Sequence, residues 1–419
     1  MLTTKAAKEA IALAMPAFGS EPVDTIAAYG RVLRQVVLAE RDQPPFDRVT
    51  MDGIAISYDA LDRGTKSFRI AGTQHAGDAV SSLLPGRDAR PDQSHSVERD
   101  GGDTHCVEIM TGAVLPVGSD CVVPVERITV SNGIAEIEQD YHAERWQFVH
   151  LQGSDHRAGA PVLEPGAVLT PAEIAIVASC GLERVEVSRQ PPIRVISTGN
   201  ELVPAGKPVL PHQVRLSNGP AVVAMLKRQG FEDCRHEHLL DDPHSLRANV
   251  GRLLGEARVL ILSGGVSMGK ADFVPQVLAD LGVRTVFHKI SQRPGKPMWF
   301  GIGPDDQSVF ALPGNPVSTL VCCRHYVLPA LFDASGRHAR RPEWAVLTED
   351  VTFRADLTFF TPVVLQSDVD GILRARPVPT NTSGDFTALG GTDGYVELAR
   401  EQSHFPQGSP VPLHRWDAP

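Results

Sequence analysis

Short hydrophobic runs separated by turn residues dominate one early part of the chain. Between residues 68 and 137 the hydrophobic positions follow the two-residue period of half-buried strands, most clearly in segments 68–70, 107–109, 121–123 and 134–137. Ser131, Asn132 and Gly133 precede the last of these segments and are typical of a hairpin turn. We therefore expect a small β domain here.

From residue 192 to residue 333 the pattern changes, because apolar runs typical of strands alternate with amphipathic segments typical of helices. Strands or extended segments are expected at residues 194–197, 232–240, 259–262, 283–289 and 309–312. Helices are expected at residues 218–229, 244–254, 273–281 and 316–331. This alternation predicts a doubly wound α/β domain, whose ligands bind at the carboxyl ends of the strands.

Three more helices are predicted nearer the N-terminus. Residues 4–15 are amphipathic, and residues 24–37 form a second helical patch that Gly30 interrupts. Residues 171–180 follow Thr170 as a cap and stop at Gly181. After a basic linker at residues 336–341, the pattern of residues 344–416 is again that of strands.

Composition and charge exclude several classes of protein. The chain has 419 residues, of which 42% are hydrophobic and 21% charged, as expected of a globular protein with two to four domains. A formal net charge of -10 argues against a nucleic-acid partner. No apolar run approaches the length of a membrane span. Six cysteines without a CxxC pair, and Glu9 within the first apolar stretch, lead us to expect a cytoplasmic protein without a signal peptide.

The sequence SGGVSMGKAD follows the apolar run at residues 259–262 directly. Gly264 and Gly265 would let the backbone turn tightly and expose N–H groups to an anion. Asp272, at the start of the next helix, could then hold a divalent cation against phosphate oxygens. A plain turn with Asp272 as helix cap explains the same residues equally well.

Three further loops also follow predicted strands, and they favour the phosphate interpretation. STGNEL at residues 197–202 supplies Glu201, and QRPGKP at residues 292–297 supplies Arg293 and Lys296. LPGNPVS at residues 312–318 leads into a helix that begins near Ser318. Two carboxylates for a cation and two cations for an anion should meet at one edge of the sheet. The loops together predict a site for a phosphorylated ligand and an oxyanion.

Two motifs before the α/β domain place polar groups on irregular segments. PPFDRVTMDGIA at residues 44–55 presents Asp47 and Asp52, either as functional carboxylates or as solvated acids of a hinge. IMTGAVLP at residues 109–116 places Thr111 beside Gly112, where it either contacts a substrate or ends a strand. Residues 86–103 are polar and rich in turns, as in a surface loop.

The motifs PPFDxxxMDGxA, IMTGAxLP, STGNEL, SGGVSMGKAD, RPGKP and LPGNPVS occur in this order over nearly the whole chain. The chain thereby closely resembles the molybdopterin molybdenumtransferases, the MoeA and gephyrin E-domain family. The resemblance implies an elongated homodimer that inserts molybdate into the dithiolene of adenylylated molybdopterin and releases AMP, with Mg2+ as cofactor. It implies no nucleic-acid or membrane partner.

The resemblance also implies a multidomain α/β fold with four domains. The central doubly wound α/β domain, which binds molybdopterin, would span residues 188–335. Small β domains would flank it at residues 44–146 and 336–419. A discontinuous, mixed helical and β domain for linkage and dimerisation would comprise residues 1–43 and 147–187.

Family roles carry over to the matching positions of this chain. Glu201 and Asp272 would be catalytic and hold the metal, and Asp52 and Thr111 would complete the catalytic set from the other subunit. Arg293, Lys296 and Ser318 would hold molybdate, and Ser383 would approach it from the last domain. The other residues expected to bind substrate are Ser197, Gly199, Gly264, Gly265, Ser267, Pro313, Gly314 and Asn315.

Three positions depart from the commonest family pattern. Asn200 stands where Asp is common, Arg293 replaces a frequent Lys, and no basic residue occurs near residues 359–363. Arg keeps the charge and gains bidentate geometry toward an oxyanion. The resemblance implies that the thiolates that bind molybdenum belong to the substrate, so no catalytic cysteine is needed. Cys322 and Cys323 fall inside a predicted helix and are expected to be core residues.

Two alternative functions share parts of the pattern. Stand-alone adenylyltransferases, which act in the preceding step, share the α/β domain, and a non-catalytic cofactor carrier or scaffold would share the binding loops. PPFDxxxMDG and the flanking β domains favour molybdate insertion. The charged set Glu201, Asp272 and Lys296 argues against binding alone.

Overall fold

The computed structural model describes residues 1–81, 104–265, 273–353 and 356–417. They form two compact units. The larger unit comprises Met1–Gln35, Pro165–Ile174 and Arg184–Pro419, and the smaller unit comprises Val36–Glu164 and Ala175–Glu183. Helix α3 (Pro171–Ser179) contributes residues to both units and confirms the helix predicted there. The division into four domains stays a prediction.

The smaller unit is built on a six-stranded sheet with the strand order β7-β4-β6-β5-β9-β8. Its strands are β4 (Gly53–Ile56), β5 (Ser67–Gln74), β6 (His105–Ile109), β7 (Cys121–Pro124), β8 (Ile128–Ser131) and β9 (Ile134–Ile137). Asn132 and Gly133, with φ of 51° and 74°, form the predicted hairpin turn between β8 and β9. Ile54, Phe68 and Val123 lie in its core, so the hydrophobic alternation predicted this sheet correctly.

Short elements complete the smaller unit. Helix α2 (Tyr58–Asp62) follows β4. Strand β2 (Val37–Leu38) pairs with β11 (Pro161–Leu163), and β3 (Arg48–Val49) pairs with β10 (Val149–His150). These pairings bring the segment that enters the sheet beside the segment that leaves it. The motif at residues 44–55 contains β3 and is therefore fixed by the pairing of β3 with β10, although its backbone is largely irregular.

The larger unit contains a second six-stranded sheet, with the order β16-β13-β17-β21-β20-β18. Its strands are β13 (Ile193–Thr198), β16 (Cys234–Leu239), β17 (Val259–Ser263), β18 (Arg284–His288), β20 (Trp299–Ile302) and β21 (Ser308–Leu312). The first four strands in the order are parallel, and β20 pairs antiparallel with both β21 and β18. The predicted α/β fold is confirmed, with β20 as a strand that the sequence pattern did not predict.

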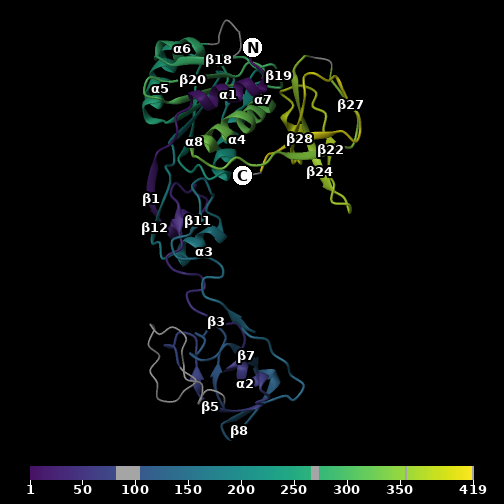
Figure 1. The fold of residues 1–419 in the computed structure, drawn as a ribbon. Helices are drawn as coiled ribbons and strands as arrows, with labels where there is room; N and C mark the ends of the chain where they lie inside the picture. The colour runs from purple at the N-terminus through teal and green to yellow at the C-terminus, as the bar shows by residue number, and fades with distance from the viewer. Residues whose placement is uncertain (82–103, 266–272, 354–355, 418–419) are drawn as a thin grey trace. The chain divides into compact units, whose positions relative to one another are not determined.

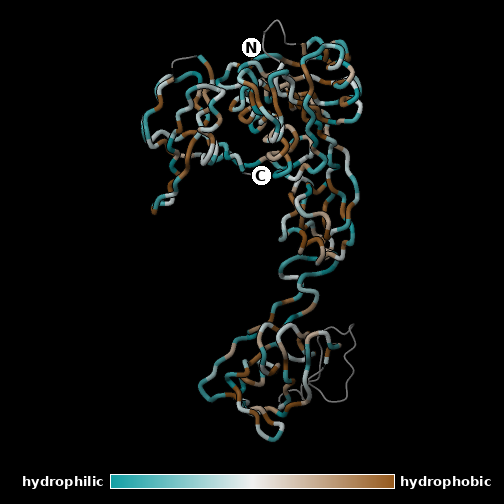
Figure 2. The backbone as a smooth tube through the Cα atoms, turned by 180° about the vertical axis from the view of Figure 1, so that it is seen from behind, coloured by the Kyte–Doolittle hydropathy of each residue, from teal (hydrophilic) through white to brown (hydrophobic). Residues whose placement is uncertain are grey.

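Helices cover both faces of this sheet (Figure 1). Val259 and Ile261 point into one hydrophobic cluster, and Leu260 and Leu262 point into the other. The first cluster includes residues of α1 (Thr4–Ala14), α4 (Asn218–Arg228) and α8 (Leu328–Ala334), and the second includes residues of α5 (Pro243–Glu256) and α6 (Val274–Asp280). A strand buried on both faces needs a continuous apolar run, which is what residues 259–262 provide. Figure 2 shows hydrophobic residues, in brown, gathered inside this part of the chain.

The last helical segment is continuous but changes its hydrogen bonding midway. It consists of α7 (Pro316–Cys322), a π-helix (Cys323–Val327) and α8. The prediction of a helix at residues 316–331 is therefore confirmed. Single π-helical turns often lie at functional sites, and this one carries His325.

The helix predicted at residues 24–37 is wrong. The chain instead forms β1 (Ser20–Asp24), which pairs with β12 (Arg184–Ser188), and one short 3-10 helix (Thr25–Ala28). Gly30 has φ of 75°, which ends the turn. Val32 and Leu33 then make β-bridges to Val168 and Val187. Pairing with a distant strand therefore overrides the weak local helical pattern.

The C-terminal part of the larger unit is a barrel. Its sheet order is β19-β24-β25-β22-β28-β26, and an additional pairing of β24 with β26 closes it. The strands are β19 (Gln292–Arg293), β22 (Glu343–Leu347), β24 (Thr358–Ser367), β25 (Leu373–Pro377), β26 (Gly394–Leu398) and β28 (Pro410–Arg415). A further pair joins β23 (Val351–Thr352) to β27 (His404–Phe405). Because β19 contains Arg293, the first residue of the RPGKP motif, and pairs with β24, this motif is attached to the barrel.

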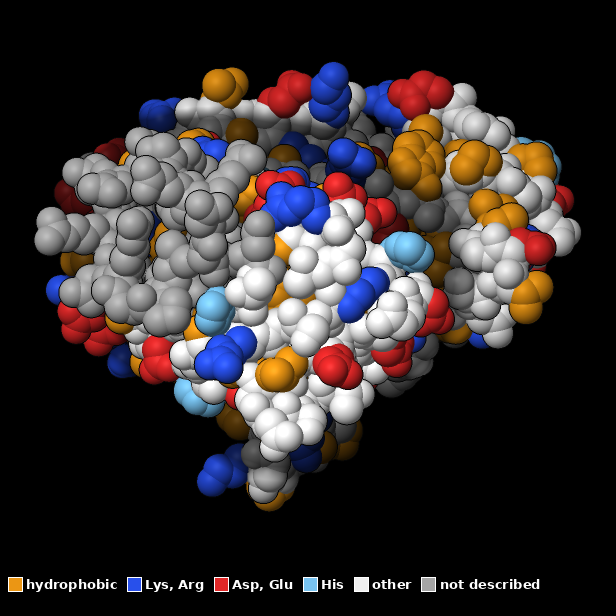
Figure 3. Space-filling model, turned by 60° about the horizontal axis from the view of Figure 1, so that its bottom comes forward, with side chains coloured by type: hydrophobic (Ala, Val, Ile, Leu, Met, Phe, Trp, Pro, Cys, Tyr) orange, Lys and Arg blue, Asp and Glu red, His pale blue; other side chains and the backbone are white. Residues whose placement is uncertain are grey.

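Charged side chains of both signs are mixed on the face drawn in Figure 3. Lys and Arg, in blue, lie among Asp and Glu, in red, and no broad patch of one sign gathers over the described residues of that face. A nucleic-acid partner would need a broad basic surface. Among the residues that the structure describes, no helix has both the length and the apolar character needed to cross a membrane.

Candidate functional site

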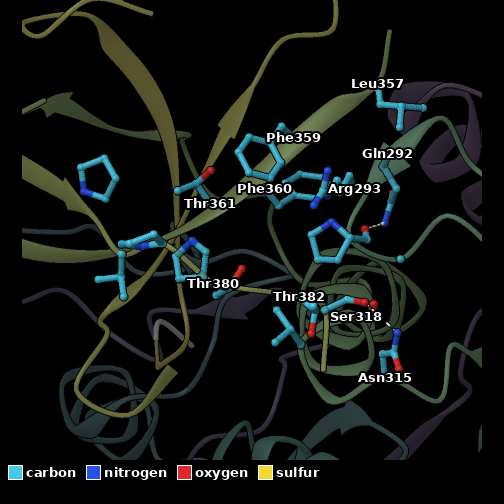
Figure 4. Close-up of a pocket in the computed structure, with 18 of the residues that line it drawn as sticks. Gln292, Arg293, Asn315, Ser318, Leu357, Phe359, Phe360, Thr361, Thr380 and Thr382 are labelled. Atoms are coloured by element: carbon cyan, nitrogen blue, oxygen red, sulfur yellow. Dashed lines mark hydrogen bonds between the residues drawn. The ribbon is translucent and has the colours of Figure 1, made fainter. Parts of the chain in front are cut away.

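A cavity of about 680 Å³ lies in the larger unit, between the loops of the central sheet and the barrel (Figure 4). Its volume is within the usual range of ligand pockets, about 300–1,000 Å³. Residues 292–297 form one wall, and the beginning of α7 forms another. The barrel supplies the start of β24 and residues 377–383. Six residues predicted to bind substrate line this cavity together, namely Arg293, Lys296, Pro313, Asn315, Ser318 and Ser383.

Arg293 is held against an aromatic pair of the barrel side. Its guanidinium carbon lies 5.7 Å from the ring centroid of Phe353, and Phe353 stacks on Phe359 with 4.3 Å between centroids. A guanidinium over an aromatic face is attracted by the ring electrons while its N–H groups stay available. Arg293 also pairs with Phe359 in the β19–β24 ladder. Arg293 of β19 is therefore the cation that lies beside the start of β24.

The two cations of the cavity are not neutralised by nearby carboxylates. Among the described residues, neither Arg293 nor Lys296 forms an ion pair, and both are exposed. Glu349 and Asp350 line the cavity as well, but Asp350 accepts a hydrogen bond of 2.8 Å from the backbone N–H of Gln407. An anionic ligand is therefore expected to bind on the side of Arg293 and Lys296.

A buried network fixes the loop that carries these cations. Gln292, which is fully buried, donates from Nε2 to the Pro294 carbonyl at 2.9 Å, and the Tyr326 hydroxyl donates to its Oε1. Gly295 has φ of 95°, and a Cβ there would lie 2.5 Å from Cys322 Sγ. Only glycine fits so close to the helix. The loop is thus bound to the α7 and π-helix segment through groups that are shielded from water.

The beginning of α7 is joined to the barrel by Ser383. Asn315 Nδ2 donates to Ser383 Oγ at 2.6 Å, and the Val317 N–H donates to the Ser383 carbonyl at 3.1 Å. Ser318, one residue further along α7, is 3% exposed and borders the cavity. Figure 4 shows Asn315 and Ser318 side by side below Arg293. Ser383 therefore reaches the start of α7 from the barrel side of the cavity, and its predicted approach to molybdate stays a prediction.

Thr361 is a polar group of the cavity that sequence reasoning missed. It lies on β24, is 5% exposed, and its hydroxyl has no hydrogen-bond partner among the described residues. Buried hydroxyls are normally paired, so this group is available to a bound ligand. Thr361 directly follows Phe359 and Phe360 on the same strand, and nothing in this stretch of sequence marks it as a binding residue.

The glycine loops that follow β13, β17 and β21 approach one another closely, with no room for a side chain at Gly264. A Cβ at Gly264 would lie 2.7 Å from the Thr198 carbonyl oxygen, and a Cβ at Gly265 would lie 2.7 Å from Val274 Cγ2. Gly264 and Gly265 have φ of 100° and 65°. A Cβ at Gly314 would lie 3.5 Å from the Gly264 Cα. The predicted convergence of these loops is therefore real.

Two buried polar atoms beside these loops have no hydrogen-bond partner among the described residues. They are Thr198 Oγ1 and Asn218 Oδ1. The other side of the Asn218 amide donates to Ser263 Oγ at 2.9 Å and to the Gly314 carbonyl at 2.7 Å. Asn218 thus ties two of the loops together and leaves one acceptor open. Sequence reasoning missed it, because it begins a helix far from either loop in the chain.

Ser197 occupies a different environment from the other predicted binding residues. It is 1% exposed, and its hydroxyl lies 3.0 Å from His236 Nε2 on the neighbouring strand. Burial lowers the pKa of His236, with a smaller effect from His238, so the imidazole is neutral. Ser197 therefore contributes to the sheet beneath the loops, and its hydroxyl is not open to solvent.

Glu201 is the described member of the predicted metal pair. Its exposed carboxylate bends over Gly199, where a Cβ would lie 2.7 and 2.8 Å from its two oxygens. Mg2+ prefers oxygen ligands and is usually held by one or two carboxylates together with phosphates and water. An open carboxylate beside the glycine loops fits that requirement. Asp272 and Ser267, the other predicted residues of this region, lie outside the described residues.

Asn200, which departs from the family pattern, has a structural role in the backbone contacts of this region. Its Oδ1 accepts the backbone N–H of Asp241 at 3.1 Å, in the segment between β16 and α5. An amide oxygen serves this contact as well as a carboxylate oxygen does. The absence of a carboxylate at this position therefore removes no observed contact.

Asp52 and Thr111 form a pair of their own in the smaller unit. The backbone N–H and the hydroxyl of Thr111 both donate to Asp52 Oδ1 at 2.6 Å. These two hydrogen bonds, the hydroxyl bond first, lower the pKa of the Asp52 carboxyl. Asp47 instead accepts the Gln152 N–H at 2.8 Å and holds the local backbone. Thr111 closely follows the end of β6 and holds Asp52 through the two hydrogen bonds, and its contact with a substrate stays a prediction.

Models of known protein families match three successive parts of the chain. Residues 2–181 match the model of the MoeA N-terminal region (domain I and II). Residues 194–333 match a probable molybdopterin binding domain, and residues 344–416 match the MoeA C-terminal region (domain IV).

Full-length relatives and solved structures agree with these matches. A molybdopterin molybdenumtransferase of Synechocystis is 39% identical over 99% of this chain and 100% of its own length, and one of Synechococcus elongatus is 35% identical over 79% of each. The crystal structure of a molybdopterin biosynthesis MoeA protein of Pyrococcus superimposes with a TM-score of 0.79, at 27% identity and full coverage of both chains. The chain belongs to the MoeA family of molybdopterin molybdenumtransferases.

Proposed function

We propose that this chain inserts molybdate into the dithiolene of adenylylated molybdopterin and releases AMP. The observation that carries the proposal is the meeting of Arg293, Lys296, Ser318 and Ser383 at one cavity beside the glycine loops. The cavity has room for a small oxyanion and part of a larger ligand. The glycine loops offer a place for the phosphates of the adenylylated pterin.

The cationic side of the cavity would act by electrostatics. Molybdate is a dianion and the pterin substrate carries phosphates, so the two reactants repel each other. Arg293 and Lys296 are already placed and unpaired among the described residues, and they would offset this repulsion without reorganisation. Thr361 and Ser318 would add neutral hydrogen bonds that orient the oxyanion.

Thiols of the protein have no part in this scheme. Burial raises the pKa of Cys323 to about 12 and raises the pKa of Cys322 as well. Both thiols are fully buried and remain protonated, so neither is available to bind molybdenum. The sulfur ligands of molybdenum come from the pterin substrate.

Magnesium is the metal that we propose for this site. Glu201, together with Asp272 and phosphate oxygens of the substrate, would hold it. Bound there, Mg2+ would neutralise phosphate charge as the phosphoanhydride bond to AMP breaks. The chain's own contribution is to fix Glu201 over Gly199, at the end of a buried strand.

We further propose a homodimer in which Asp52 and Thr111 of one copy serve the site of the other. What supports this role is that the Asp52 carboxylate is exposed and that two hydrogen bonds favour its ionised form. An ionised carboxylate held in this way would accept a hydrogen bond from a bound water or substrate group and orient it.

Release of AMP from adenylylated molybdopterin by the purified chain tests the proposed function. We expect release that requires both molybdate and Mg2+, and Glu201→Gln should reduce it. Rapid AMP release without molybdate would contradict molybdate insertion. Tight pterin binding without any release would indicate a carrier instead.

A further inference from the structure

Three side chains with metal-binding atoms meet behind the cavity, outside the site described above. His325 lies in the π-helix, Glu397 on β26 and His414 on β28. One ligand atom of each lies within 4.8 Å of the other two. Glu397 Oε2 is 3.0 Å from His414 Nε2 and 3.9 Å from His325 Nε2.

His325 is buried with an unsatisfied nitrogen that faces this cluster. The residue is 1% exposed, and its Nε2 has no hydrogen-bond partner among the described residues. Its other nitrogen, Nδ1, lies 3.1 Å from the Tyr395 hydroxyl. If Nδ1–H donates to that oxygen, the lone pair of Nε2 points at Glu397. A buried imidazole nitrogen without a partner needs an explanation, and a metal ion would supply one.

The arrangement has two features of known metal sites. Two imidazoles and one carboxylate form a common donor set for zinc, which leaves a fourth position for water. The contact of His325 Nδ1 with Tyr395 is the outer contact that usually fixes the ring of a ligating histidine. Tetrahedral zinc needs ligand atoms about 3.3 Å apart, given bonds of about 2.0–2.1 Å. The separations of Glu397 Oε2 from the two histidine nitrogens, 3.0 and 3.9 Å, are close to this value, and the two histidine nitrogens lie within 4.8 Å of each other.

We propose that His325, Glu397 and His414 bind a divalent transition-metal ion of the zinc class. The ion would join the π-helix to two strands of the barrel. Phe360 lies between this cluster and the cavity, since its ring centroid is 4.5 Å from that of His325 and it lines the cavity wall. Metal binding would therefore stiffen the part of the cavity wall that Phe360 forms.

The charged groups around the cluster set how tightly the ion binds. Lys8 of α1 and Arg324 of the π-helix both act electrostatically on the cluster, and Thr4 contacts Glu397. Lys8 and Arg324 repel a cation, whereas Glu397 attracts it. Without metal, His414 Nε2–H donates to Glu397, so metal binding moves that proton to Nδ1 or releases it.

Zinc titration of the full-length, chelator-treated protein by calorimetry tests the proposal. We expect one site per chain. Glu397→Gln and His414→Gln should each weaken zinc binding by more than about 100-fold. Loss of a residue that only contacts a metal ligand typically weakens metal binding by at most about that factor. Lys8→Met should tighten binding, because it removes a repelling charge. These variants avoid the fully buried His325, whose replacement risks misfolding.

Two controls make the test specific. His404→Gln removes an exposed histidine 4.0 Å from Asp350, on the neighbouring strand pair, and should leave zinc affinity unchanged. Co2+ in place of zinc should give the visible absorption of a four-coordinate ion in the wild type and lose it in Glu397→Gln. Absence of stoichiometric binding, or equal binding in wild type and Glu397→Gln, would show a metal-free hydrogen-bonded cluster and overturn the proposal.

Discussion

At the scale of single residues, Arg293 combines a fixed position with an open charge. The ring of Phe353 supports its guanidinium, while the adjacent loop is held from below by Gln292. An exposed arginine on a flexible segment would lose more side-chain freedom on binding an anion than Arg293 does, because Arg293 is already held in place. The contact with Phe353 therefore preorganises the Arg293 guanidinium for binding an anion.

Arg293→Lys should lose less activity than Arg293→Met. Lys keeps the charge but loses the bidentate fork, and we expect a loss of about tenfold or less in kcat/KM for molybdate. Met removes a charge-assisted contact worth about 1.5–3 kcal/mol, or roughly 10- to 100-fold. Steady-state AMP release at varied molybdate measures both. Equal activity of the two variants would contradict a role for the charge.

Thr111→Val should raise the pKa of Asp52 toward its ordinary value, because the hydroxyl hydrogen bond is the largest cause of its lowering. A carboxylate with a lowered folded-state pKa stabilises the fold above its unfolded pKa, and this contribution is lost as pH falls through the folded pKa. The stability difference between wild type and variant should therefore shrink in acid. NMR titration of the carboxyl carbon measures the pKa, and an unchanged value would exclude the bond.

At the scale of elements, the loop with the cations depends on the π-helix region beneath it. Tyr326→Phe removes the hydroxyl that donates to the buried Oε1 of Gln292. We expect a loss of about 1–3 kcal/mol in the free energy of unfolding, because an acceptor stays buried without a partner. Urea denaturation measures it. Tyr29→Phe, at an exposed tyrosine, is the matched control and should have little effect.

The elements that the sequence predicted well are those with strong periodicity. Residues 259–262 form a strand buried on both faces, and α5 carries an apolar stripe. β20 was missed, because Trp299–Ile302 contains Gly301 and gains its strand character only from its neighbours β21 and β18. The error at residues 24–37 has the same origin, since pairing with β12 replaces local propensity there.

The site was predictable where it lies in loops that follow strands. The motifs placed Arg293, Lys296 and Ser318 correctly at one cavity, because strand ends of a parallel sheet share an edge. The supporting groups were not predictable. Gln292 and Tyr326 are 34 residues apart, and only packing of the helix beneath the loop brings them together. Their side chains carry no motif of their own.

At the scale of the whole molecule, the proposal of a shared site predicts complementation between two inactive variants. Asp52→Asn mixed with Glu201→Gln, after exchange of subunits, should recover about a quarter of wild-type activity. After random exchange, half of the dimers contain one copy of each variant. In each of these two-fold symmetric dimers, one of the two sites has both Asp52 and Glu201 intact.

A mixture of Asp52→Asn with Thr111→Val is the matched control, because both changes affect the same predicted contribution. It should recover much less. No recovery in the first mixture, with subunit exchange verified by mass, would place all catalytic residues of a site within one chain or exclude a role for Asp52.

The half-saturating molybdate concentration for AMP release shows whether Lys296 and the cavity around it hold the oxyanion. It should be measured in the wild type, in Lys296→Met and in Lys207→Met, an exposed lysine outside the cavity. We expect roughly a 10- to 100-fold increase in Lys296→Met alone, with unchanged affinity for the adenylylated pterin. An unchanged molybdate requirement in Lys296→Met would show that this cavity does not hold the oxyanion.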